Sequence, residues 1–177
     1  NQNILLPKEG KVSYGNKADE LKLAQQYLQK AIASNPDFAE AHLRLGRVMG
    51  LLGNHRQALA ELQQAAASLK DPQLLYYASL YLGYEFGMFS RRSEAREQYE
   101  RAAMLYATAQ SPLLALSQLA RNSDDTKSAQ LAMQHVFELP RGDRWNDDPW
   151  WIYDLAHVRD ADALVAGMQK MLGGLLQ

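Results

Sequence analysis

One pattern of small and large apolar residues returns along this chain at a nearly constant distance. The octads "AQQYLQKA" (24–31), "ALAELQQA" (58–65) and "AREQYERA" (95–102) each place Ala first, a large apolar residue four positions on, and Ala again three positions later. They begin 34 and then 37 residues apart, and a degenerate fourth copy begins at Ala129, another 34 residues on. A period of this size restricts the chain to architectures made of stacked copies of one supersecondary unit.

The segments around the octads have helical periodicity. Between Ala58 and Leu69, apolar residues recur three and four positions apart, which places them on one face of a helix. β-Branched residues are scarce, whereas Ala, Leu, Gln, Glu and Arg, which favour helices, are abundant. The pairs "NP" at 35–36, "GN" at 53–54, "DP" at 71–72 and "SP" at 111–112 separate these segments as turns do. The sequence therefore predicts an all-α protein.

A Leu-Gly pair precedes two of the octads at the same distance. Gly46 stands twelve residues before Ala58, and Gly83 stands twelve residues before Ala95. Each unit therefore holds two helices. Glycine inside the first helix destabilises that helix by about 1 kcal/mol relative to Ala, so its presence there indicates that another helix packs very close to it. We expect tight helix crossings at both glycines. Between the helices, "GNHRQA" predicts a turn in which Gly53 ends one helix and the Asn side chain that follows it caps the next.

A two-helix unit with this period and pattern resembles the tetratricopeptide repeat (TPR). The residues that carry the resemblance are Leu45, Gly46, Ala58, Leu62 and Ala65 in 39–72, then Leu82, Gly83, Phe86, Ala95, Tyr99 and Ala102 in 76–110, with Ala24, Leu28, Ala31 and Pro36 in an earlier, partial unit. This resemblance implies a right-handed α-solenoid of TPR helix-turn-helix hairpins, an α-α superhelix. His42 and Ser79 depart from it, because the family often has a bulky aromatic residue there.

The resemblance also divides the chain. An irregular N-terminal segment is expected at 1–16, because the Leu-Gly helix that should come before Ala18 is missing. The solenoid is expected over 17–143, as a partial unit 17–38, units 39–75 and 76–110, and a degenerate unit 111–143. An atypical helical cap is expected at 144–177. We expect the three additional residues before the third octad either in the helix that ends near Leu69 or in the loop to Pro72.

All three tryptophans lie in the stretch "DRWNDDPWWIY" at 143–153. Its aromatic members are Trp145, Trp150, Trp151 and Tyr153. Asp148 is predicted to cap a helix that starts at Pro149. A solenoid needs an atypical unit to cover its last open face, so this stretch is interpreted as a cap. The competing interpretation is an aromatic surface that contacts a sugar, a base or a peptide.

The residues that carry catalysis or hold metals do not assemble in this sequence. Cys is absent, and the four histidines show neither the paired spacing nor the thiolate companions of a metal site. Phosphate-binding glycine loops are absent as well, and the acidic pairs precede predicted helices, where capping explains them. We therefore expect no enzyme activity, no cofactor and no metal. A net charge of -1 and the lack of a long apolar run argue against nucleic-acid binding and membrane insertion.

The resemblance implies a binding surface on the concave face, which the first helix of each TPR unit lines. Carried onto this chain, the expected groove residues are Glu40, Leu43, Arg44, Arg47, Tyr77, Leu80, Tyr81, Tyr84, Gln118 and Arg121. Tyr and Arg are enriched at binding hot spots, although such tyrosines also pack between helices. Asn and Lys or Arg on this face clamp the acidic ends of heat-shock chaperones in some TPR proteins. The apolar and aromatic residues here do not predict that partner.

These observations favour a non-catalytic interaction module, a TPR scaffold that binds a peptide segment or a partner helix in its groove. The alternative is an accessory solenoid of a larger enzyme or carbohydrate-binding protein, in which the tryptophans contact the ligand. Self-association through the open N-terminal end is a further possibility, with "NILL" (3–6) available to cover it. The first residue is Asn rather than Met, which suggests processing or excision and leans towards an extracytoplasmic, periplasmic or secreted, protein.

Overall fold

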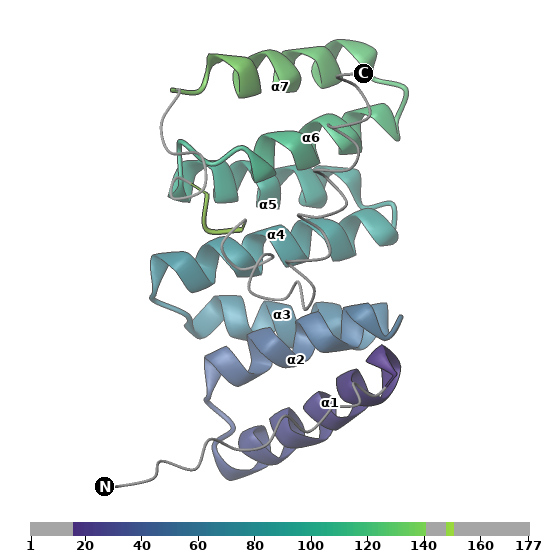
Figure 1. Ribbon diagram of the computed structural model, residues 1–177, viewed down its shortest axis with the longest axis vertical. Coiled ribbons are helices and arrows are strands. Elements are labelled where there is room, and N and C mark those ends of the chain that lie inside the picture. Colours follow the sequence, from purple (N-terminus) through teal and green to yellow (C-terminus); the bar gives the residue numbers. More distant parts are fainter. Residues whose placement is uncertain (1–15, 141–147, 151–177) are drawn as a thin grey trace, which may run out of the picture.

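The computed structural model describes residues 16–140 and 148–150, and the described elements are helices stacked in chain order (Figure 1). Their bounds are α1 Lys17–Ser34, α2 Ala39–Leu51, α3 His55–Ser68, α4 Pro72–Met88, α5 Arg92–Leu105, α6 Ser111–Arg121 and α7 Thr126–Glu138. The main packing partners are α2 with α3, α4 with α5, and α6 with α7, and each pair also contacts the next. The predicted all-α solenoid is confirmed over the described residues.

The helices cross tightly at the two predicted glycines. A Cβ atom on Gly46 would come within 2.6 Å of Cγ of Leu62, and one on Gly83 would come within 2.6 Å of Cδ1 of Tyr99. Both large residues are the fifth members of their octads. The first and last alanines of these two octads, Ala58, Ala65, Ala95 and Ala102, are fully buried. The small residue on one helix thus admits the large residue of its hairpin partner, as the pattern predicts.

Helix ends follow the turn chemistry only in part. Asp71 caps α4, because its Oδ1 accepts a hydrogen bond from the Leu74 N–H at 2.9 Å, and Pro72 opens that helix. Gly53 has φ +81°, as expected for a residue that ends a helix. Asn54 stands at the N-cap position of α3 but its side chain makes no capping hydrogen bond. The predicted side-chain cap at Asn54 is therefore wrong, and the turn is held by its backbone N–H, which donates to the Met49 carbonyl at 2.9 Å.

The additional residues of the second full unit lie in α4. This helix has 17 residues, whereas α2 has 13, and α3 and α5 have 14 each. Our expectation of a longer α3 or a longer loop is therefore wrong. The added turn lies at the start of α4, since Asp71 and Pro72 begin the helix ahead of Tyr76, the residue that corresponds to Ala39 in the preceding unit.

Candidate functional site

The first helices of the three units meet around one short stretch from the C-terminal part of the chain. Asp148, Pro149 and Trp150 make hydrogen bonds or ring contacts with α2, α4 and α6. We call the side of the solenoid formed by these three helices the first-helix face, and the three residues the DPW segment. Figure 1 draws the DPW segment as the short yellow-green ribbon near α4.

The carboxylate of Asp148 is the most enclosed part of this contact. Its Oδ1 accepts a hydrogen bond from the Tyr76 hydroxyl at 2.6 Å, and its Oδ2 accepts one from the Ser111 backbone N–H at 2.8 Å. Asp148 is 1% exposed and Tyr76 is fully buried. Ser111 is the first residue of α6, so the negative charge lies at the positive end of a helix dipole. The first-helix face thus contains a built receptor for a carboxylate.

The same carboxylate accepts two capping hydrogen bonds. Oδ1 also accepts the Trp150 N–H at 3.0 Å, so Asp148 caps the turn that begins at Pro149, as the sequence predicts. Gln110, the N-cap residue of α6, makes no capping hydrogen bond with its own side chain. Asp148, 37 positions after Ser111 in the chain, supplies the acceptor instead.

Tyrosine and arginine side chains hold the rest of the DPW segment. The Tyr77 hydroxyl donates to the Pro149 carbonyl at 2.9 Å, and Pro149 is buried. The Trp150 ring meets the Tyr81 ring edge-on, with centroids 5.8 Å apart. The Arg47 guanidinium lies 4.9 Å from the Tyr81 centroid and 5.8 Å from the Trp150 centroid, within cation–π range of both. Each residue of the segment is therefore held by a different kind of contact.

Burial shifts the ionisation of the receptor tyrosine. Removal of the Tyr76 hydroxyl from water, and then its hydrogen bond to the Asp148 carboxylate, raise the pKa of Tyr76 far above its usual value. The Tyr76 hydroxyl is therefore neutral near pH 7 and donates its hydrogen to the Asp148 carboxylate. The Tyr76 ring also meets those of Tyr77 and Tyr106 edge-on, which fixes the direction of the hydroxyl.

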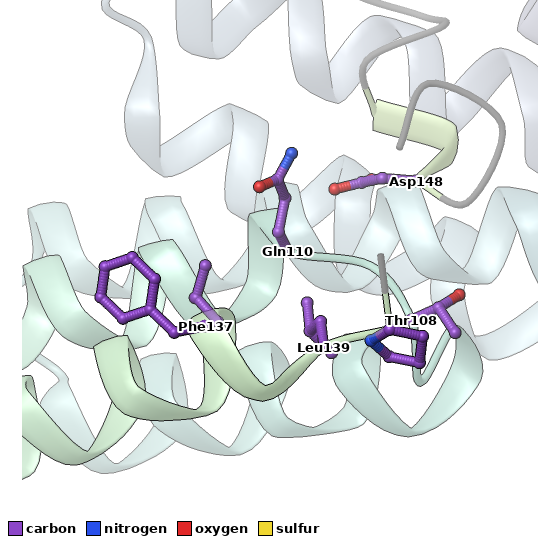
Figure 2. Close-up of a pocket in the computed structure, with 7 residues that line it drawn as sticks. Thr108, Gln110, Phe137, Leu139 and Asp148 are labelled. Carbon is purple, nitrogen blue, oxygen red and sulfur yellow. The ribbon is translucent and has the colours of Figure 1, made fainter. Parts of the chain in front are cut away.

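A small pocket lies beside the Asp148 site, between the end of α7 and the loop that leads into α6. Its volume is about 110 Å³, and its lining includes Thr108, Gln110, Phe137, Leu139 and Asp148. Gln110 and Asp148 lie along one side of the pocket, with the apolar side chains of α7 and of the residues after it on the other (Figure 2). The pocket is thus continuous with the carboxylate receptor.

Comparison with known proteins agrees with this architecture. Residues 17–81 match the family model described as the tetratricopeptide repeat. This part of the chain therefore has the sequence pattern of tetratricopeptide repeats. The full sequence has no match among curated proteins.

Solved structures extend the likeness of this TPR chain over most of the described helices. MamA from Desulfovibrio magneticus RS-1 superposes with a TM-score of 0.63 at 21% identity, over 68% of this chain and 67% of that one. A second MamA crystal structure gives 0.61 at 18% identity, over 71% and 75%. The APC/C hetero-tetramer Cut9–Hcn1 gives 0.58 at 21% identity, over 68% of this chain but only 22% of that one. At these identities the likeness concerns the fold alone.

The TPR structure separates the expected groove residues into two sets. Leu43, Tyr77, Leu80 and Tyr81 are buried in the main core, against which Trp150 also packs. Tyr84 is 47% exposed, while Gln118 and Arg121 are exposed on α6. The structure thus brings part of the expected set into contact with the DPW segment and leaves another part at the surface.

Some expected residues are engaged along their own helix. Arg44 donates to Glu40 Oε1 through both Nε (2.9 Å) and Nη2 (2.6 Å), and Gln118 Nε2 donates to Asn122 Oδ1 at 2.7 Å. Trp145, Trp151 and Tyr153 lie outside the described residues. The predicted cap over the last hairpin stays a prediction for them, whereas the three described residues of that stretch bind to the first-helix face.

Sequence reasoning missed Tyr76 as part of the site. It gave Asp148 a local capping role, and nothing in the local pattern points to a partner 72 positions away. The family pattern places Tyr76 beside, rather than among, the expected groove positions. Its signal was the doubled "YY" at 76–77, in a helix position where the preceding unit has Ala39.

Two of the described histidines, His42 and His55, pair with carboxylates. His42 Nδ1 lies 2.6 Å from Glu61 Oε2, and His55 Nδ1 lies 2.9 Å from Glu85 Oε2. The first pair joins α2 to α3, and the second joins α3 to α4. Within 16–140 and 148–150, no cluster of His and acidic residues has the arrangement of a metal site. In the same ranges no helix is long and apolar enough to span a bilayer.

Proposed function

We propose that this TPR protein is a non-catalytic scaffold that binds a peptide segment of a partner protein on its first-helix face. One observation carries the proposal: this face already binds a segment of peptide, the DPW segment, through a carboxylate receptor, a tyrosine hydroxyl and an aromatic–arginine stack. Groups that recognise peptide features of this kind are the ordinary means of protein–protein recognition.

The exposed part of the face extends the surface available to a partner. Tyr84 on α4 and the α6 side chains Gln118 and Arg121 are exposed, and Tyr and Arg are the residues most often found at binding hot spots. The helices that hold them are packed before any partner arrives. Binding to such a preformed surface costs little conformational entropy.

The alternative of an accessory sugar-binding or enzyme-attached solenoid gains no support from Trp150. That ring packs against Tyr81 and lies within cation–π range of Arg47, so it is already engaged on the first-helix face. The proposal therefore assigns Trp150 to the occupied site rather than to a ligand surface.

The test is capture of partners from a lysate of the cell that expresses the protein, with the parent chain and two face variants as bait. Tyr84→Ala removes an exposed anchor and should weaken the captured complex roughly 30-fold, the equivalent of about 2 kcal/mol. Arg47→Glu reverses the charge beside Tyr81 and should lower the association rate, most strongly at low salt.

A matched control makes the same Arg-to-Glu change on α5, which is the second helix of its repeat unit. Arg92 is exposed at the start of α5, so Arg92→Glu should leave capture unchanged. Capture that survives both face variants, or that falls equally with Arg92→Glu, would show that the first-helix face is not the binding surface.

A further inference from the structure

The DPW segment meets the solenoid as a ligand meets a receptor. The Asp148 carboxylate binds Tyr76 and the Ser111 amide, the Pro149 carbonyl binds Tyr77, and the Trp150 ring binds Tyr81 and Arg47. Apart from its own cap, in which Trp150 N–H donates to Asp148, every one of these contacts crosses to another helix. Among the described residues, the face thus contacts a carboxylate, the carbonyl of a buried proline and an aromatic ring, in consecutive positions.

The receptor groups would be costly to leave empty. Tyr76 is fully buried with the DPW segment in place, and departure of the segment removes the charged acceptor of its hydroxyl. The α6 N-terminus has no side-chain cap of its own, because Gln110 makes none. Loss of a charge-assisted hydrogen bond and an uncapped helix end are both unfavourable, which favours refilling of the site by another carboxylate.

We propose that this site is a receptor for the sequence Asp-Pro-aromatic, that the DPW segment fills it in cis, and that a partner with the same motif displaces the segment. The inference rests on the proposed function, and it names the partner's recognition motif and a built-in competitor. It also commits to a partner protein as occupant, rather than to a second copy of this chain.

The exposed side chains on the same face favour a partner over the cis segment. A tethered segment competes at an effective concentration that reaches the millimolar range for short linkers, so a bare motif in trans binds weakly. A partner that adds contacts to Tyr84 or Arg121 gains affinity that the DPW segment lacks, because both side chains stay exposed while that segment is bound. A partner must therefore bind this face more favourably than the tethered DPW segment does before it can occupy the site.

The first experiment measures binding of a fluorescent peptide of residues 146–151, "NDDPWW", to the full chain and to the double variant Asp148→Ser, Trp150→Ala. Ser retains a capping oxygen for the segment but supplies no carboxylate. Removal of the cis competitor should tighten peptide binding about tenfold or more, because the apparent affinity scales with the fraction of open sites. Equal affinity for the two proteins, or no binding to either, would overturn the proposal.

The second experiment leaves the DPW segment intact, so it does not depend on how well the double variant folds. The peptide in which Asn replaces the Asp before Pro should bind the parent at least several-fold more weakly than the original, and Tyr76→Phe should abolish that preference. Phe retains the ring packing of Tyr76 and removes only the hydroxyl. No preference for Asp in the parent protein would contradict the receptor.

Sedimentation at increasing protein concentration decides between a partner and a second copy. A monomer that binds the peptide supports the proposal, whereas a dimer that the peptide dissociates would assign the receptor to exchange of segments between copies and overturn the choice of partner. The peptide tests can fail while Tyr84→Ala still loses its captured partners. That result would support the proposed scaffold function and rule out only the Asp-Pro-aromatic motif.

Discussion

At the scale of the residue, the specific contacts of this protein depend on a few buried polar groups. Asp148, His42 and Glu85 are each nearly inaccessible to water, and each has a hydrogen-bond partner on a different helix or segment. A buried polar group without a partner costs about 1–3 kcal/mol, so these pairs restrict which helices can neighbour one another. They therefore add specificity to a core that is otherwise aliphatic and aromatic.

The His42 pair makes the stability of the first hairpin dependent on pH. Burial lowers the pKa of His42, but the hydrogen bond to Glu61, the hydrogen bond to the Pro36 carbonyl and the nearby negative charge together raise it above its ordinary value of 6.5. Only the imidazolium can donate from both ring nitrogens, to Glu61 at 2.6 Å and to Pro36 at 2.8 Å. The charged form is thus favoured in the folded protein.

From the sign of this shift, the protein should become less stable as the pH rises. A histidine whose folded pKa is raised contributes its full stability below pH 6.5 and loses it as the pH rises through the folded pKa. Urea unfolding between pH 6 and pH 8.5 should therefore give a falling free energy of unfolding in the parent. His42→Phe and Glu61→Gln should both flatten the slope, and identical slopes in the parent and His42→Phe would exclude this pair as the cause.

At the scale of the element, helix–helix distance is set by glycines rather than by helix propensity. Gly83 lies where any Cβ would enter the space of the Tyr99 ring, whereas a Cβ on Gly87, one turn further along α4, would meet nothing within 4 Å. The same helix thus contains a glycine that packing requires and one that packing does not require. Comparison of substitutions at Gly83 and Gly87 therefore separates the effect of helix propensity on stability from the effect of packing.

Substitution of the two glycines should change stability in opposite directions. Gly87→Ala should stabilise the protein by about 0.5–1 kcal/mol, because Ala is the better helix former. Gly83→Ala should destabilise it by about 1–3 kcal/mol, because overpacking against Tyr99 exceeds that gain. Urea unfolding of both variants measures the difference, and a stabilising Gly83→Ala would contradict the tight crossing of α4 and α5.

At the scale of the whole molecule, each helix depends on its neighbours in the stack. Ten residues of α4 are buried, but none of α1 is, although α1 has the same octad as α3 and α5. Leu28 and Ile32 of α1 pack against α2 and α3 on one side, while Leu23 and Tyr27 are exposed. In a solenoid, stability is close to a sum of nearest-neighbour terms, so α1 receives less than the central helices.

Hydrogen exchange should therefore be fastest in α1 and slowest in α4. Local opening of a helix with few buried contacts costs less free energy than opening of a central helix. Mass spectrometry of exchange at two protein concentrations tests this order and the predicted self-association together. Protection of α1 equal to that of α4 at low concentration would contradict the stacking argument, whereas protection that appears only at high concentration would indicate self-association through the N-terminal end.

The period of the sequence was sufficient to predict the repeat architecture and its closest contacts. Ala58, Leu62, Gly46 and their counterparts one unit later are local signals, because the geometry of a helical hairpin fixes which positions face each other. Arg47, Tyr77 and Tyr81 of the expected groove contact the DPW segment of the same chain. Whether the first-helix face binds a partner stays a prediction.

Only the tertiary structure decided what occupies that face. The sequence predicts Asp148 as a local cap, and its carboxylate does accept the Trp150 N–H, yet it also caps α6 and binds Tyr76 at a separation of 72 positions. No periodic pattern encodes such a contact, because it depends on where the chain returns after α7. The added turn of α4 was equally hidden, since a helix and a loop of the same length leave the octad spacing unchanged. Repetition determines how neighbouring units stack, and the singular contacts between distant segments are determined by the packed chain as a whole.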